Sequence, residues 1–391
     1  MIETTAALAE FCDRCAEHPY VTIDTEFLRE RTYYSQLCLI QLAYPGDGPE
    51  TAVLIDPLSP DLDLAPLYAL FQNRDVTKVF HAARQDLEIF FVDKQIFPEP
   101  FFDTQVAAMV CGFGEQVGYE TLVRKIAKSD LDKSSRFTDW SRRPLTKRQQ
   151  DYALADVTHL RQIYEYLSRR LEETDRRDWV EEELGVLIAP ETYIVDVDLV
   201  WRRVKTRNTS PKFLAIVREL AKYREITAQT RNVPRNRILK DDAIVELAGL
   251  KPKSVQDLSA TRLLLREARK GEVADGIVAA VARGLEADPA TYPRPPASLP
   301  RKQGAEGVSE LLRVLLKARS EQSNVAQKLI ATSADLDRLA ADDDPDIPAV
   351  RGWRRKLFGA DALRLKNGEI ALAVDKGGVR MIDLAASSAD E

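Results

Sequence analysis

The first half of the chain alternates between short apolar runs and longer helical patterns. The apolar runs at residues 21–27, 36–43, 51–56 and 78–81 have the length and composition of strands. Apolar positions at three- and four-residue spacing predict a helix at residues 85–93, directly after the fourth run. Two consecutive strands, followed by strands that alternate with helices, predict a mixed sheet flanked by helices.

The rest of the chain is mostly helical in pattern. Thr146 is a suitable N-cap for a long helix that continues to residue 173. Further helices are predicted at residues 213–220, at residues 238–247 and around Leu263, separated by the turn-forming stretches NVPRN and GLKPKS. The stretch EADPATYPRPPASLPRKQGAEG contains five prolines, which predicts a semi-rigid linker.

A weak internal repeat connects the helical regions on either side of this linker. With a gap of three residues the two regions align, and the matched pairs are Ile238 with Ile330, Ile244 with Leu336 and Leu247 with Leu339. Alternating apolar residues around two glycine turns predict a small hairpin near the C-terminus. We therefore expect an α/β domain and then two small all-α domains; the boundaries are 1–195, 205–288, a linker at 289–307, and 308–384.

Length, hydropathy and cysteine content narrow the class of protein. The chain has 391 residues, more than one hydrophobic core usually serves, and no apolar stretch reaches the roughly 20 residues that cross a bilayer. The N-terminus lacks the pattern of a signal peptide, so a cytoplasmic location is expected. Cys12 and Cys15 form a C-x-x-C, which could serve redox chemistry or half of a zinc site. No second such motif accompanies it, which favours ordinary buried thiols.

Basic residues gather in two regions of an acidic chain. The net charge is −6, from 56 basic and 62 acidic residues. Residues 201–240 nevertheless contain twelve Lys and Arg against two Glu, and residues 124–148 contain nine against three Asp. Such concentrations are typical of a phosphate-binding surface, although either one taken alone also fits a solvated helix face.

Two acids lie in a segment that otherwise has the pattern of a buried strand. Asp24 and Glu26 are two residues apart, which on a strand places both carboxylates on one face, roughly 7 Å apart. Like charges on a buried face repel and lose hydration, and a divalent cation compensates both effects. Hard oxygen ligands suit Mg²⁺ or Mn²⁺. Asp86, at a strand-to-helix junction, and Asp156, on the long helix, are the further candidate ligands.

A phenol accompanies the last of these acids. Tyr152 precedes Asp156 by four residues, so that on a helix both side chains share a face. Each acid alone could be an ordinary surface charge and Tyr152 an ordinary core aromatic. Their joint occurrence is what points to a site.

The motifs DTE, HAARQD and YALAD resemble, in order and spacing, the three motifs of the DEDD 3′-to-5′ exonucleases. Tyr152 is similar to the tyrosine of one subclass, whereas the other subclass has His at the position of Asp151. With DTEFLRERTYYSQLCLIQLA, LDKSSRFTDWSRRPLT and the basic helices, the resemblance extends to the ribonuclease D family. The resemblance covers about residues 1–190 as the exonuclease domain and 207–287 as a helicase-and-ribonuclease-D C-terminal (HRDC) domain. The third region resembles a diverged second copy.

The resemblance implies a ribonuclease H-like mixed sheet and metal-dependent phosphodiester hydrolysis. Asp24, Glu26 and Asp156 would bind the catalytic metal, and Asp24 and Asp86 would hold a second one. Two cations about 3.5–4 Å apart can activate water and stabilise the leaving 3′ oxygen. Tyr152 would position the attacking water, because a phenol with a pKa near 10 is a poor base.

The substrate implied by the resemblance is RNA with a single-stranded 3′ end, such as a tRNA precursor. A monomeric enzyme is expected to degrade it to nucleoside 5′-monophosphates. Stacking and phosphate contacts hold such ends. Phe27 is a candidate wall for the terminal base, with ordinary core as the alternative. The other candidate substrate contacts are Arg31, Tyr33, Lys133, Arg136 and Arg142, and Arg143 belongs to the same basic loop. His81 is expected to be structural, and Asp103 an N-cap.

Two other functions are alternatives to this one. The same chemistry on DNA is the nearest alternative, and no identifiable residue reads a 2′-hydroxyl. A catalytically inactive nucleic-acid-binding scaffold is disfavoured, because all four acids and Tyr152 are present.

Overall fold

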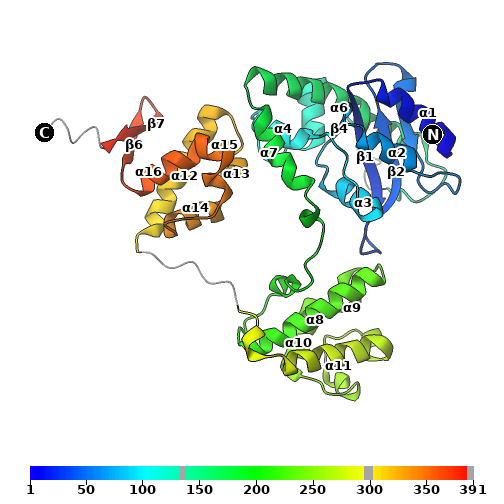
Figure 1. Cartoon of the computed structure of the whole chain (residues 1–391), viewed down its shortest axis with the longest axis vertical. Helices are drawn as coiled ribbons and strands as arrows, with labels where there is room; N and C mark the ends of the chain where they lie inside the picture. The colour runs from blue at the N-terminus through cyan, green and yellow to red at the C-terminus, as the bar shows by residue number, and fades with distance from the viewer. Residues whose placement is uncertain (133–137, 295–302, 385–391) are drawn as a thin grey trace.

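The computed structural model describes residues 1–132, 138–294 and 303–384. Figure 1 shows an N-terminal α/β domain, a group of helices (α8–α11) set apart from it, and a last group (α12–α16) next to α7. Among the described residues, no helix is both long enough and apolar enough to span a membrane.

A five-stranded mixed sheet forms the centre of the first domain. Its order is β3-β2-β1-β4-β5, with β1 antiparallel to β2 and parallel to β4. The strand bounds are β1 Tyr20–Leu28, β2 Gln36–Ala43, β3 Ala52–Ile55, β4 Thr77–Phe80 and β5 Phe101–Asp103. The central strand β1 therefore carries Asp24 and Glu26, and the predicted mixed sheet is confirmed.

The helices of this domain pack against the sheet and against each other. They are α1 Thr5–Ala16, α2 Ala65–Gln72, α3 Arg84–Lys94, α4 Thr104–Val110, α5 Tyr119–Leu122, α6 Lys147–Glu173 and α7 Arg177–Leu187. Thr146 caps α6 with a capping box, because its hydroxyl accepts from the backbone of Gln149 while the Gln149 side chain accepts from the backbone of Thr146. The predicted N-cap is confirmed.

The C-x-x-C motif is part of this core. Cys12 and Cys15 are free thiols on α1, and both are buried. Burial raises the pKa of Cys12 to about 12, so the thiolate needed for redox chemistry or zinc binding is disfavoured. The interpretation as ordinary buried thiols agrees with this environment.

The second domain consists of helices around its own apolar core. Its helices are α8 Pro211–Thr230, α9 Arg235–Ile238, α10 Asp241–Leu250 and α11 Gly271–Glu286. The helix predicted around Leu263 is wrong, because Leu263 lies in a bend with its side chain about half exposed. The backbone N–H groups of Arg262 and Leu263 donate to the Glu246 carboxylate at 2.7 and 2.8 Å instead of entering a helical ladder.

The last part is not all-α, which corrects the prediction of two all-α domains. Its helices are α12 Ala305–Ser323, α13 Gln327–Ile330, α14 Ser333–Ala341, α15 Gly352–Arg354 and α16 Ala360–Lys366. The predicted terminal hairpin follows them as β6 Ile370–Asp375 and β7 Gly378–Asp383. Trp353 stacks on Trp179 of α7 with ring centroids 4.6 Å apart, and one continuous apolar cluster contains residues of this part and of the first domain.

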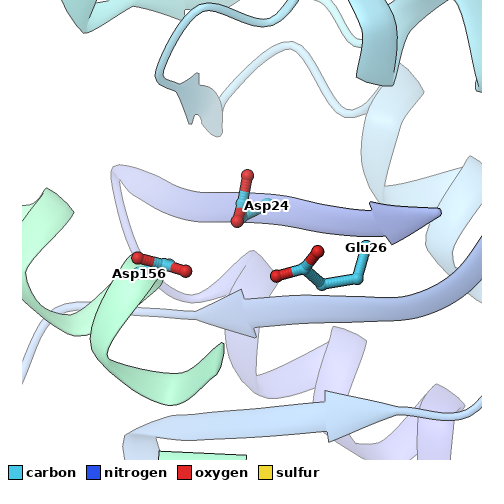
Figure 2. A group of neighbouring side chains, drawn as sticks. All are labelled: Asp24, Glu26 and Asp156. Carbon is cyan, nitrogen blue, oxygen red and sulfur yellow. The ribbon is translucent and has the colours of Figure 1, made fainter. Parts of the chain in front are cut away.

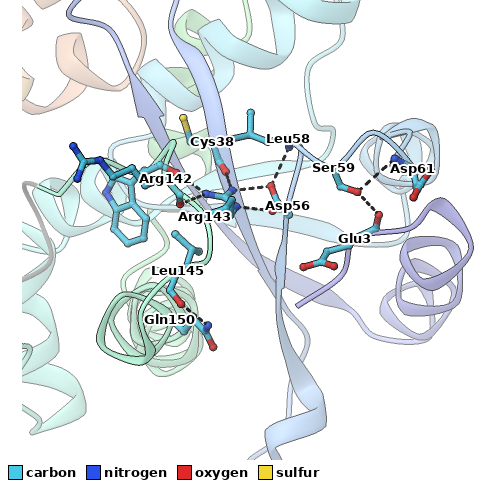
Figure 3. A network of polar contacts seen from close by, with 11 residues as sticks. Glu3, Cys38, Asp56, Leu58, Ser59, Asp61, Arg142, Arg143, Leu145 and Gln150 are labelled. Atoms are coloured by element: carbon cyan, nitrogen blue, oxygen red, sulfur yellow. Dashed lines mark hydrogen bonds and ion pairs between the residues drawn. The ribbon is translucent and has the colours of Figure 1, made fainter.

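Arg143 fixes the segment that leads into α6 against the sheet (Figure 3). Its guanidinium donates to both carboxylate oxygens of Asp56, at 2.6 and 2.7 Å, and to the carbonyls of Cys38 and Trp140. Burial opposes ionisation of Asp56, but the hydrogen bonds from Arg143 and from the backbone of Leu58 prevail and lower its pKa. Arg143 is therefore a structural clamp, which corrects its proposed place among the RNA contacts.

We expect Arg143→Ala to destabilise the protein by about 3 kcal/mol, because it leaves the Asp56 carboxylate enclosed without its cation. Arg143→Lys should recover only part of this loss, since an ammonium cannot form the two-pronged contact. Arg142→Ala is the matched control: its ion pair with Asp139 is exposed and should contribute less than about 1 kcal/mol. Urea denaturation measures all three, and equal losses for Arg142→Ala and Arg143→Ala would contradict the assignment.

Candidate active site

Three carboxylates converge between the central strand and the long helix. Asp24 and Glu26 extend from β1 and Asp156 extends from α6, and Figure 2 shows the three side chains turned toward one another. One oxygen of each lies within 4.8 Å of the others, and among the described residues this is the group with the spacing of a metal site. An all-carboxylate donor set fits a hard divalent cation such as Mg²⁺ or Mn²⁺.

Two hydroxyl groups from other elements fix the backbone of α6 where Asp156 lies close to Asp24 and Glu26. Thr22, on the same face of β1 as Asp24, donates to the carbonyl of Val157 at 2.8 Å. The Tyr119 hydroxyl lies 3.0 Å from the carbonyl of Ala155 and 2.7 Å from that of Asp156. The backbone on both sides of the Asp156 side chain is thus fixed by residues of other elements.

The fourth acid reaches the site from α3. Asp86 is buried, and its carboxylate accepts a short hydrogen bond from the hydroxyl of Thr25, the residue between Asp24 and Glu26. Burial raises the pKa of Asp86 to about 7. Asp86 is close enough to raise the pKa of Asp24, but it is not a member of the group of three. The structure therefore brings three of the four predicted ligands together and leaves the fourth outside this group, hydrogen-bonded to Thr25.

A cavity of about 250 Å³ opens onto the carboxylates. Tyr152 lines it together with Asp24 and Asp156, and the Tyr152 ring lies 6.1 Å from that of Trp140. The residues that line the cavity are Asp24, His81, Gly118, Tyr119, Glu120, Thr121, Leu131, Tyr152, Asp156 and Leu160. The phenol and the carboxylates of Asp24 and Asp156 thus border the same space.

Charge repulsion is the dominant electrostatic feature of this space. The pKa of Asp24 is raised well above its usual range by burial, and then by the nearby carboxylates of Asp156, Asp86 and Glu26. Burial and the same negative field also raise the pKa of Tyr119. A bound cation removes the repulsion directly, so the site favours an ionised state only with a cation present.

Comparisons with known proteins agree over nearly the whole chain. Residues 1–172 match the 3′-5′ exonuclease family and residues 213–281 match the HRDC domain. A ribonuclease D of Jannaschia is 59% identical and one of Nitrobacter hamburgensis 49%, each over 98% of this chain and 99% of the relative. The chain belongs to the ribonuclease D family. It is accordingly a 3′-5′ exoribonuclease.

A solved structure supports the same fold for this chain. The crystal structure of Escherichia coli RNase D superposes with a TM-score of 0.81 at 30% identity, over 94% of this chain and 98% of the other. The catalytic core of RRP6 from Trypanosoma brucei superposes at 0.56 with 19% identity and supports the fold alone.

Three of the predicted RNA contacts have side chains that are at least partly exposed to solvent: Phe27, Arg31 and Arg142. Phe27 is half-buried beside the register irregularity between Glu26 and itself. Arg31 is exposed and lines a cavity of about 370 Å³ that also includes Leu28 and Ser141. Arg142 is exposed on the surface and pairs with Asp139. Lys133 and Arg136 lie outside the described residues.

Tyr33 is not placed to contact RNA, which corrects that prediction. Its side chain is 8% exposed and belongs to the apolar core of the HRDC domain. Its hydroxyl donates to Glu225, so the ring is turned away from the cavity that opens onto the acids. In the sequence, an aromatic residue in a basic loop fits both RNA stacking and core packing. Only its packing in the structure distinguishes these two roles.

Sequence reasoning did not find Thr25 and Tyr119. Thr25 could have been suspected, because a polar residue alternating to the core face between two ligands needs a partner. Tyr119 is not part of a recognisable motif, and its hydroxyl contacts backbone carbonyls 36 and 37 residues later in the sequence.

His81 lines the cavity and contacts Thr104 at 3.0 Å through Nδ1, while Asp103 caps α4, as expected of an N-cap.

Protons should compete with the cation for this site. We expect the affinity for Mn²⁺ to fall as the pH decreases below about 7, because Asp86 becomes protonated there and the raised pKa of Asp24 also favours its protonated form. Conversely, the metal-free protein should lose stability as the pH rises from about 3.8 toward about 7, because the folded state binds more protons than the unfolded chain over that interval.

Calorimetric titration with Mn²⁺ at several pH values measures the first effect, and thermal denaturation in EDTA the second. Asp86→Asn should flatten both dependences near neutral pH. An Mn²⁺ affinity that stays constant from about pH 6 to 8 would contradict the arrangement of charges described.

Proposed function

We propose that this exoribonuclease trims the 3′ ends of RNA, including tRNA precursors, and releases nucleoside 5′-monophosphates with the help of two divalent cations. The observation that carries the proposal is the convergence of Asp24, Glu26 and Asp156 beside a cavity that Asp24, Asp156 and Tyr152 line. The E. coli relative is described as an exoribonuclease involved in structured RNA processing, which agrees with a structured precursor as substrate.

Four acids would hold the cations. Asp24, Glu26 and Asp156 would supply the ligand oxygens of one site, and Asp24 and Asp86 would help to hold the other cation. When bound, two cations supply an activated water and stabilise the charge on the leaving 3′ oxygen. The hydrogen bond from Thr25 fixes the orientation of Asp86. Hydrogen bonds from Thr22 and Tyr119 to the backbone of α6 do the same for Asp156.

Tyr152 positions the attacking water in this proposal. Its ring packs near Trp140 and it lies one helical turn before Asp156, so its hydroxyl and that carboxylate border the same cavity. The reference pKa of a tyrosine phenol is near 10, which makes it a poor base for a water molecule. Tyr152 therefore acts as a hydrogen-bonding group rather than as a base.

Basic side chains hold the RNA on either side of the cut. Arg31 and Arg142 are exposed near the end of β1, and Phe27 is available to stack on a base. Lys133 and Arg136 belong to the same basic segment. The HRDC domain adds a pocket of about 380 Å³ at which Arg203 and Lys240 are exposed, whereas its other two basic residues, Arg224 and Arg235, are paired with Asp241 and Glu225. Phosphate contacts of this kind make binding strongly dependent on salt.

Residues 308–384 form a second HRDC-like domain in this proposal. The long, short and medium helices α12, α13 and α14 repeat the order of α8, α9 and α10. All three matched pairs of the sequence repeat are buried: Ile238 with Ile330, Ile244 with Leu336, and Leu247 with Leu339. The proposal also includes the domain bounds 1–195 and 205–288, a monomeric enzyme and a cytoplasmic location.

Asp24→Asn should lower the rate of RNA degradation by roughly 10²–10³-fold or more, because it removes the carboxylate common to both metal positions. RNA affinity should be nearly unchanged, and thermal stability in EDTA should rise because a buried charge is lost. Asp151→Asn, the same change at an exposed site on α6, is the control that should keep full activity. Gel assays of a labelled RNA, with and without EDTA, measure the rates. Activity that survives either Asp24→Asn or EDTA would exclude the metal-dependent mechanism.

A substrate comparison tests the choice of nucleic acid. We expect a 3′-extended tRNA to be shortened faster than a single-stranded DNA of equal length, because the HRDC pocket can bind phosphates of the folded part. The initial rates of shortening, measured at equal substrate concentration and ionic strength, test this expectation. Equal rates on both would favour the alternative of a general 3′-5′ exonuclease that also acts on DNA.

A further inference from the structure

The loop that follows the metal-binding strand contacts the HRDC domain more than its own sheet. Residues 29–35 connect β1 to β2, and strand pairing on both sides stops at Leu28 and Gln36. Arg29 joins this loop to α3 through two hydrogen bonds to Glu88, at 2.9 and 3.2 Å. Beyond the loop, Tyr33 and Tyr34 instead contact residues of α8, of α9 and of the turn between these helices.

Tyr33 is the centre of these contacts. Its hydroxyl donates to the Glu225 carboxylate and accepts from Arg235 at 2.8 Å and from Gln229 at 3.1 Å. The guanidinium of Arg235 also lies over the Tyr33 ring, 4.7 Å from its centroid. The backbone N–H groups of Tyr33 and Tyr34 both donate to the side-chain oxygen of Asn232, at 3.1 and 3.0 Å.

The charges in this cluster depend on one another. Glu225 is fully buried, and its carboxylate is neutralised by a two-pronged contact from Arg235 at 2.5 and 2.6 Å. Burial opposes ionisation of Glu225, but the hydrogen bonds from Arg235 and Tyr33 prevail and lower its pKa. Burial and the bond to Glu225 raise the pKa of Tyr33 to about 12, so the phenol remains a donor at neutral pH. Each member therefore needs the others to be stable in an apolar environment.

We propose that Tyr33, Asn232, Glu225 and Arg235 form an interdomain latch through which the HRDC domain positions the loop beside the active site. Tyr33 is a positioning residue: it holds Arg31, two residues earlier, at the rim of the cavity of about 370 Å³ next to β1. The HRDC domain then contributes to catalysis in a second way, by ordering part of the substrate path, in addition to binding RNA itself.

The latch should affect substrate binding rather than the chemical step. Asp24 and Glu26 are held by the pairing of β1 with its neighbouring strands, and this pairing does not involve residues 29–35. Loss of the latch frees Arg31 and leaves the carboxylates in place. The expected signature is therefore a raised KM with a nearly unchanged kcat. This part of the inference rests on the proposal that Arg31 contacts RNA.

The test compares Tyr33→Phe with Tyr223→Phe in the full-length enzyme. Tyr223 is partly buried in the same domain and donates its hydroxyl to the carbonyl of Val273 at 3.3 Å, away from the loop. Tyr33→Phe removes a hydroxyl that makes three hydrogen bonds, whereas Tyr223→Phe removes one that makes a single bond, so thermal denaturation should show a larger stability loss for Tyr33→Phe. Trypsin cleavage after Arg29 and Arg31, followed by mass spectrometry, reports whether the loop has been released without requiring any RNA.

We expect Tyr33→Phe to accelerate this cleavage by about tenfold, since a hydrogen bond to a charged group is lost. We also expect a rise in KM of about the same factor for a short single-stranded RNA that fills the active site alone. Tyr223→Phe should change neither. Equal cleavage rates in the two variants would overturn the latch. Faster cleavage with an unchanged KM would overturn its link to substrate binding, and the exonuclease assignment would stand in either case.

Asn232→Gly is the second variant, needed if Tyr33→Phe does not fold. Asn232 has a φ of +47°, a conformation that glycine adopts easily, so the substitution removes the acceptor of two loop N–H groups with little change in the backbone. It should release the loop and raise KM as Tyr33→Phe does. Combining the two variants should give less than the product of their separate effects, because both open the same contact.

Discussion

The crowding of carboxylates around Asp24 is the constraint on which the rest of the molecule depends. Asp24, Glu26 and Asp156 have oxygens within 4.8 Å of one another, and Asp86 adds a fourth charge nearby. Such an arrangement opposes folding, because like charges repel and lose hydration. It persists only if the surrounding structure holds each acid in place independently. The central position of β1, the hydroxyls of Thr22 and Tyr119, and the Arg143 clamp serve this purpose.

The same constraint links stability to function. A site that disfavours its own ionised state in the absence of metal has a strong electrostatic reason to bind divalent cations, and the stability lost in the metal-free protein becomes binding free energy. The support also has to be rigid, because a small displacement of α6 would separate Asp156 from the two acids on β1. This explains why α6 is fixed near Asp156 by side chains from β1 and α5, and at its start by Arg143.

The sequence predicts the parts of the site that depend on local periodicity. Asp24 and Glu26 follow from strand alternation, the pairing of Tyr152 with Asp156 from helical spacing, and the cap at Thr146 from its chemistry. The incorrect predictions concern residues whose environment depends on partners elsewhere in the chain. Tyr33 and Arg143 lie in segments whose aromatic and basic composition suits RNA binding and structural contacts equally, and their main partners are distant in sequence. Leu263 has a helical pattern locally, but the Glu246 carboxylate binds the backbone groups that a helix would use. Composition cannot show which distant residue provides a partner.

The two C-terminal parts contact the exonuclease domain by different physical means, and this difference suggests different roles. The last part joins the first domain through a continuous apolar cluster, the stacked Trp179 and Trp353, and an ion pair between Glu183 and Arg354. Burial of that kind stabilises both partners at once and resembles a single folded unit. At the loop after β1, the HRDC domain instead makes hydrogen-bonded contacts around one tyrosine. Polar contacts are sensitive to geometry and contribute less to stability than to orientation. The apolar interface therefore maintains the fold, whereas the polar one determines where the loop beside the active site lies.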